Sequence, residues 1–151
     1  MVVGKQFFDF DRVIYFSTNA TESKAEALLT KSNLSTPEKY YSEIISGDYP
    51  SRLQEIDTNR FAGLSFKKKN LDTTTFSTFR QVFATKAPSD GITMSCMPVY
   101  RDIIVFVDKG KISGIAKICF GCHQYQLLGQ RANTETFGSD SDYAKLGQIL
   151  K

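Results

Sequence analysis

The sequence contains only one histidine, His123, and it lacks several motifs that common catalytic and nucleotide-binding sites require. The P-loop, G-x-G-x-x-G and H-E-x-x-H are all missing. A serine or cysteine nucleophile would therefore need His123 as its base. Cys122 precedes His123, and neighbouring side chains of an extended strand point to opposite faces, so the two do not form a nucleophile–base pair. The sequence therefore favours a protein that is not an enzyme.

Long apolar runs and a strong net charge are also missing. No run approaches the ~20 apolar residues that a membrane helix needs, so we expect no membrane insertion. A net charge of +3, from 19 basic and 16 acidic residues, is too small to indicate nucleic acid as a partner. With 41% hydrophobic and 23% charged residues, the chain has the composition of a folded, soluble domain and not of a disordered segment.

The length of the chain and its N-terminal residues limit the number of domains and the possible locations of the protein. The 151 residues show no internal repeat and no linker, so we expect a single domain over 1–151. Met1 to Lys5 lack the apolar core of a signal peptide. A chain whose leader had been removed would look the same, so the sequence leaves both the cytoplasm and the periplasm open.

The densest apolar stretch, Asp102 to Gly129, is predicted to hold a central β-hairpin. Residues 103–107 and 112–118 are rich in β-branched side chains, and the polar turn between them contains Gly110, which can adopt a positive φ. Both strands carry apolar residues on both faces. We therefore place the hairpin, about 102–118, at the centre of a mainly antiparallel sheet covered by helices.

The register of this hairpin can be counted outward from its turn. If Lys109 and Gly110 form a two-residue loop, Asp102 lies opposite Lys117. Opposite charges at facing positions stabilise a pair of strands, so we predict an Asp102–Lys117 cross-strand pair. A one-residue bulge at Gly110 would shift this register.

The remaining elements are predicted from periodicity and capping residues. Strands are expected at 12–17, 60–66 and 123–128. Helix starts are expected at Asn19, Thr36, Asp72 or Thr73, and Ser139–Asp140. The basic run 67–69 indicates a solvated strand end or loop. The predicted fold class is α+β, with the sheet flanked by three to four helices.

The three cysteines form the clearest candidate site. The hairpin count brings Cys96 close to Cys119 and Cys122, with His123 adjacent, so these four residues make a candidate thiol cluster. An odd number of cysteines leaves at least one outside any pair within the chain. The simplest interpretation is buried apolar side chains with one structural disulfide that involves Cys96.

Three further interpretations of this cluster stay open. Four ligands of the right type favour a structural zinc site, although only one C-x-x-C pair is present. Cys119 and Cys122 are also spaced as a redox dithiol, but low-pKa pairs usually begin a helix. The segment 119–123 matches C-x-x-C-H, the pattern for covalent haem attachment, yet it ends a strand and no second histidine exists. We therefore expect no cofactor, with zinc and haem c as the alternatives.

Several residues carry a resemblance to a known group. These are Tyr100-Arg101-Asp102, Phe106, Gly114, Ile118-Cys119-Phe120-x-Cys122, Phe137-Gly138 and Leu146. With them the chain resembles an uncharacterised group of small bacterial proteins, frequent in Bacteroidota, which have an upstream cysteine, a β-hairpin, an I-C-F-x-C segment and a C-terminal helix. The resemblance covers roughly the last sixty residues well. It implies the fold and no activity, and His123 lies outside the shared pattern.

Together these observations lead to two hypotheses of function. The first is a non-enzymatic protein-binding module, in its sharpest form an immunity protein that neutralises a bacterial toxin. The second is a structural-metal or thiol-redox protein that uses Cys96, Cys119 and Cys122. The first follows from the ordinary composition and the single histidine, and the second from the cysteine cluster.

Overall fold

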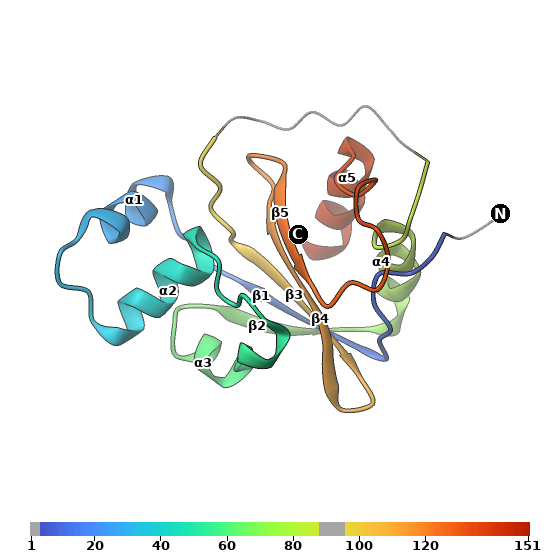
Figure 1. Ribbon diagram of the computed structural model, residues 1–151, viewed down its shortest axis with the longest axis horizontal. Helices are drawn as coiled ribbons and strands as arrows, with labels where there is room; N and C mark the ends of the chain where they lie inside the picture. Colours follow the sequence, from blue (N-terminus) through green and yellow to red (C-terminus); the bar gives the residue numbers. More distant parts are fainter. Residues whose placement is uncertain (1–3, 88–95) are drawn as a thin grey trace.

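A five-stranded antiparallel sheet forms the centre of the computed structural model, which describes residues 4–87 and 96–151 (Figure 1). The strands lie in the order β2-β1-β3-β4-β5. Their bounds are β1 Arg12–Ser17, β2 Lys67–Leu71, β3 Asp102–Asp108, β4 Lys111–Cys119 and β5 Gln124–Leu128. The hairpin β3–β4 occupies inner positions of the sheet. Both the predicted α+β class and the antiparallel sheet around this hairpin are confirmed.

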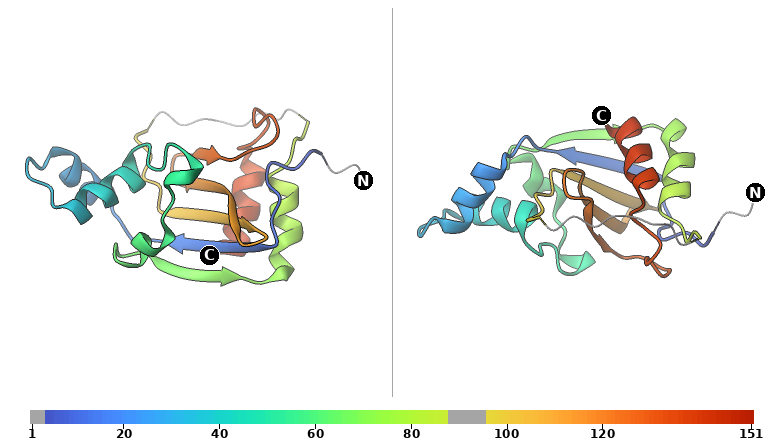
Figure 2. Two further views of the ribbon diagram at one scale, coloured as in Figure 1. Left: turned by 60° about the horizontal axis from the view of Figure 1, so that its bottom comes forward. Right: turned by 90° about the horizontal axis from the view of Figure 1, so that it is seen from above.

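Helices cover both faces of the sheet. The α-helices are α1 Glu22–Thr30, α2 Thr36–Ser46, α3 Thr58–Ala62, α4 Phe76–Val82 and α5 Asp140–Leu150, with short 3-10 turns at Leu53–Glu55 and Thr73–Thr75. Helices α4 and α5 lie side by side on one face, as Figure 2 shows, while α1, α2 and α3 pack on the other. In the part of the chain that the structure describes, no helix is long and apolar enough to cross a membrane.

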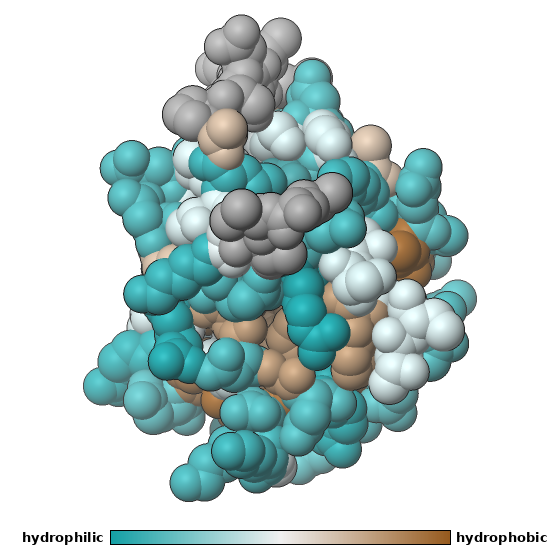
Figure 3. Space-filling view, turned by 90° about the vertical axis from the view of Figure 1, so that its right-hand side faces the viewer, coloured by the Kyte–Doolittle hydropathy of each residue, from teal (hydrophilic) through white to brown (hydrophobic). Residues whose placement is uncertain are grey.

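Two apolar cores follow from the alternation of side chains along the strands. On β3, Ile104 and Phe106 point toward α4 and α5, whereas Ile103 and Val105 point toward α1, α2 and α3. All four are fully buried. Hydrophilic side chains dominate the surface on the side that Figure 3 shows, where they surround a smaller apolar area.

Local capping explains where the helices begin. Ser35 caps α2 and Ser139 caps α5, each in a reciprocal capping box with the residue three positions on. The prediction for α5 is therefore confirmed, whereas the α2 cap lies one residue before the predicted Thr36. The first helix is capped by Thr21 and not by Asn19, because the Thr21 hydroxyl accepts from the amide of Lys24. Asp72 caps the turn that leads into α4.

The predicted strand at 60–66 is wrong. Asp57 accepts a hydrogen bond from the amide of Asn59 and starts helix α3, which buries Phe61. Phe61 and Leu64 are three residues apart, a helical spacing that also fits the observed structure. The strand follows as β2, an edge strand on which only Leu71 is buried. Lysines at an exposed edge discourage pairing with other chains.

The hairpin register differs from the simple count by one residue. Asp108 faces Lys111 and Val107 faces Ile112, as counted, but Phe106 faces Gly114, so Ser113 is an extra residue of β4. This bulge lies inside the strand and not at Gly110.

The predicted Asp102–Lys117 pair is wrong as a consequence. Asp102 faces Ile118, and Lys117 faces Ile103. Since a slip of one residue moves a side chain to the other face of a sheet, the two charges lie on opposite faces.

The loop before β1 explains the bulge and leads to a first prediction. The Ser113 hydroxyl donates to the carbonyl of Asp9, and the buried ring of Phe8 covers Gly114 and stacks on Phe106. Because a Cβ at position 114 would overlap that ring, we expect Gly114→Ala to destabilise the protein by about 1–3 kcal/mol. Urea unfolding measures this change.

The matched control for this substitution is Gly121→Ala. A Cβ at position 121 meets nothing within 4 Å, so its unfolding midpoint is expected to stay close to that of the parent protein. Equal midpoints for the two variants would contradict the close contact between Phe8 and Gly114.

Candidate functional site

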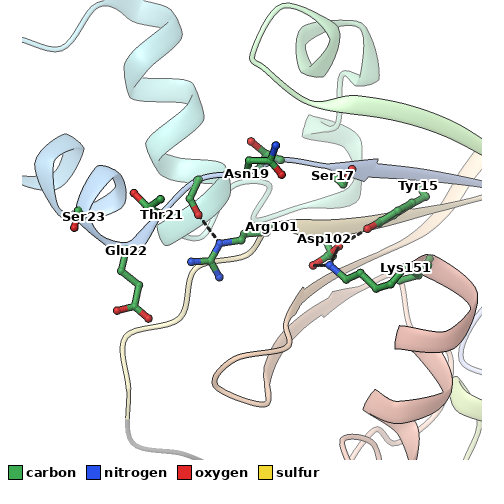
Figure 4. Close-up of a pocket in the computed structure, with 12 residues that line it drawn as sticks. Tyr15, Ser17, Asn19, Thr21, Glu22, Ser23, Arg101, Asp102 and Lys151 are labelled. Carbon is green, nitrogen blue, oxygen red and sulfur yellow. Dashed lines mark hydrogen bonds and ion pairs between the residues drawn. The ribbon is translucent and has the colours of Figure 1, made fainter.

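A polar cleft of about 750 Å³ opens where β1 leaves the sheet for α1. Its walls are residues 17–23, Arg101 and Asp102 at the start of β3, and Leu150 and Lys151 at the end of α5. The cleft therefore joins segments from the beginning, the middle and the end of the chain (Figure 4).

A buried carboxylate forms the inner end of this cleft. Asp102 is only 3% exposed, and the hydroxyl of Tyr15 donates to its Oδ1 atom. The Nζ atom of Lys151 lies 3.0 Å from Oδ1 and 3.1 Å from Oδ2. Burial, together with the carboxylate of Asp102, raises the pKa of Tyr15, so its hydroxyl keeps its proton and remains a donor. Asp102 is thus held by one neutral donor and one cation.

Arg101 is fixed beside this group by the linker between β1 and α1. Its Nε atom donates to the carbonyl of Ala20, and its own carbonyl accepts from the amide of Thr18. In Figure 4 its guanidinium lies between the start of α1 and the Asp102–Lys151 pair. An arginine that is held in this way loses little conformational freedom when it binds a ligand.

Two lysines of the edge strand β2 stand on the same face of the sheet as the cleft. The register places Lys67 opposite Ser17 and Lys69 opposite Tyr15, and residues directly opposite each other share a face. Both lysines are exposed. The basic run that was predicted to be solvated therefore does lie at the surface, and it adds positive charge beside the cleft.

Lys117 lies on the opposite face of the sheet, at a second cleft of about 410 Å³. It is 1% exposed, and its Nζ atom donates to the carbonyls of Gly47 and Tyr49, at 2.9 Å each. The ring of Tyr100 lies 4.8 Å from the same atom. Burial lowers the pKa of Lys117 to about 7, against a smaller opposing effect of the Asp48 carboxylate.

The three cysteines do come together, at the end of β4. Cys96 and Cys122 form a disulfide, with their Cα atoms 6.0 Å apart. Cys119 is a buried free thiol, and it packs with Cys122 and Tyr100 in a small cluster of buried side chains. The disulfide that involves Cys96 agrees with the simplest interpretation of the sequence.

His123 makes its contacts with α5. Its Nδ1 atom lies 3.2 Å from Oδ1 of Asp140, and its ring stacks on Tyr143 at a centroid distance of 4.3 Å. Among the residues for which coordinates are described, no group of three or more His, Cys, Asp or Glu side chains is placed to hold a metal ion. Zinc and haem stay predictions from the sequence.

Most of the cleft could not be found from the sequence. The sequence predicts a role for Asp102 as the cross-strand partner of Lys117, and it predicts no site that contains Tyr15, Arg101 or Lys151. The one available signal was a carboxylate at the start of a strand that is otherwise apolar, because a buried charge needs a partner.

Comparisons with known proteins add no identification. A scan of protein-family models, a search of curated proteins and a search of solved structures each found no match. The features that bear on function are therefore the two clefts and the three cysteines.

Proposed function

We propose that this protein is a non-enzymatic binding module that docks an acidic surface of a partner protein in the cleft at Arg101. The observation that carries the proposal is the fixed arginine, which the carbonyl of Ala20 holds at the cleft wall. Arginine is, with tryptophan and tyrosine, among the side chains that are enriched where binding energy at protein interfaces is concentrated.

The cleft lining carries two cations, Arg101 and Lys151, and two anions, Glu22 and the buried Asp102. The excess of positive charge that favours an acidic partner therefore comes from lysines beside the cleft. Lys151 is paired with Asp102, but its side chain is 55% exposed, so its ammonium can also face a ligand. Lys67 and Lys69 extend the positive charge along the neighbouring edge of the sheet. Such a field speeds association with a negatively charged partner.

The sharpest form of this proposal is an immunity protein that neutralises a bacterial toxin. Inhibition of this kind requires a stable surface that covers the partner, and it needs no chemistry of its own. The Tyr15–Asp102 hydrogen bond fixes the carboxylate that pairs with Lys151, so the exposed ammonium of Lys151 is preorganised at the cleft.

Co-expression with the products of neighbouring genes tests the proposal. We expect this protein to restore growth to cells that express an adjacent toxin, and to bind that toxin in solution. Arg101→Ala is expected to weaken the binding by about tenfold or more, because a central arginine is lost. Titration calorimetry measures the dissociation constants.

Arg12→Ala is the matched control for this experiment. Arg12 is an exposed arginine at the opposite end of β1, away from the residues that line the cleft. Its substitution is expected to leave binding and growth unchanged. Absence of any neutralised toxin, or equal binding by the Arg101 and Arg12 variants, would contradict the proposal.

A further inference from the structure

Three sulfur atoms with different accessibility meet at the turn between β4 and β5. Cys96 is an exposed residue, whereas Cys119 and Cys122 are 2% and 5% exposed. Cys122 is bonded to Cys96, and the free thiol of Cys119 lies in the same buried cluster as Cys122. Thiol–disulfide exchange needs a thiolate that reaches a disulfide sulfur, and Cys119 and Cys122 lie in one small cluster.

The turn that joins Cys119 to Cys122 also suits a bond between them. Only Phe120 and Gly121 separate the two cysteines, which is the C-x-x-C spacing of redox-active pairs. Gly121 is exposed, and a Cβ at that position would meet nothing within 4 Å. Gly121 itself is therefore not packed against the rest of the protein, whereas the Phe120 ring contacts that of Tyr143 at a centroid distance of 6.2 Å.

We propose that Cys119 exchanges with the Cys96–Cys122 disulfide, which converts Cys96 into a reactive surface thiol. Cys119 first gives its proton to solvent, and its thiolate attacks the Sγ atom of Cys122. The Cys119–Cys122 bond forms while the Cys96–Cys122 bond breaks, and Cys96 leaves as a thiolate that takes up a proton. One disulfide and one thiol exist before and after the step, so no oxidant or reductant is consumed.

The difference in burial gives the exchange a direction. After the exchange the free sulfur is that of Cys96, an exposed residue, whereas before it the free sulfur is that of Cys119, which is 2% exposed. The side-chain amide of Gln124 donates to the carbonyl of Cys96 at 2.6 Å, so Cys96 is held near the turn by a contact that the exchange does not break.

The Cys96 thiol that the exchange releases determines the chemical class of ligand at this site. A surface thiolate at Cys96 attacks a partner that carries a disulfide, which forms a mixed disulfide at Cys96 and releases the partner's second sulfur as a thiolate. This site does not depend on the Arg101 cleft, and its test is independent of the binding experiment.

Alkylation of the native protein followed by peptide mapping tests the proposal. The folded wild-type chain is treated with N-ethylmaleimide between pH 7 and 9, quenched with acid and digested without reduction. We expect the label on Cys96 together with a Cys119–Cys122 disulfide. The labelling rate is expected to rise about tenfold per pH unit while the thiolate fraction increases.

The position of the label decides between the outcomes. A label on Cys119 with the Cys96–Cys122 bond intact would overturn the proposal, and so would a protein that stays unlabelled while its unfolded form reacts fully. The variant Cys119→Ser is expected to take no label at Cys96. The wild-type map decides the question even if that variant does not fold.

Discussion

Asp102→Ala is expected to destabilise the protein by about 2–3 kcal/mol, because the buried Tyr15 hydroxyl loses its carboxylate acceptor and the ion pair with Lys151 is lost. Asp102 is 3% exposed and Tyr15 is 5% exposed, so water does not readily replace the missing carboxylate. The Lys151 side chain is 55% exposed and regains solvent, so its share of the loss is small. Urea unfolding at neutral pH measures the change.

Two further variants separate the contributions to this loss. Asp102→Asn keeps an acceptor for the Tyr15 hydroxyl and removes only the charge, so its cost is expected to be about 1 kcal/mol. The double variant Tyr15→Phe with Asp102→Ala removes both partners and is expected to cost less than the sum of the single changes. Additive single changes would show that the Tyr15–Asp102 hydrogen bond does not stabilise the fold.

Lys117 is expected to make the stability of the protein depend strongly on pH. The pKa of Lys117 is about 7 in the folded protein, and that of an unfolded lysine is about 10.4. Between these values the unfolded chain binds one more proton than the folded one, so the free energy of unfolding rises with pH. The expected slope is about 1.4 kcal/mol per pH unit between pH 7 and 10. Below pH 7 the lysine is charged in both states and its contribution no longer varies.

The variant Lys117→Met isolates this effect from other titrating groups. The free energy of unfolding of the wild-type protein, minus that of Lys117→Met, is expected to increase from pH 7 to pH 10. Lys111→Met is the matched control, since Lys111 is an exposed lysine on the same strand. If the wild-type and Lys117→Met curves ran parallel over this range, Lys117 would have an ordinary pKa and its two carbonyl contacts would hold an ammonium.

Local sequence patterns predicted which helices and strands form better than they predicted the register in which the strands pair. The hairpin followed from β-branched runs around Gly110, and the start of the segment that leads into α4 followed from the capping residue Asp72. The bulge at Ser113 was not predictable, because it depends on Phe8 and Asp9 from a loop far away in the sequence. Because of this one extra residue, Asp102 and Lys117 lie on opposite faces of the sheet.

Of the two candidate sites, the sequence predicted the cysteine cluster but not the cleft around Asp102. The meeting of Cys96 with the C-x-x-C segment followed from the hairpin count, because those residues are close to the ends of paired strands. The partners of Asp102 were not predictable, since Tyr15 lies on β1 and Lys151 follows α5. No short-range pattern connects them, and only the folded sheet brings them together.

The central claim is that the cleft at Arg101 binds acidic protein segments, and amide chemical-shift mapping tests it most directly. A hexaglutamate peptide is added to the isotope-labelled protein at low ionic strength. We expect shifts concentrated at residues 17–23, Arg101 and Lys151, which are lost at about 0.5 M salt because exposed charges are then screened. The largest shifts at the hairpin turn 108–111, or the same shifts with a hexalysine peptide, would contradict the account.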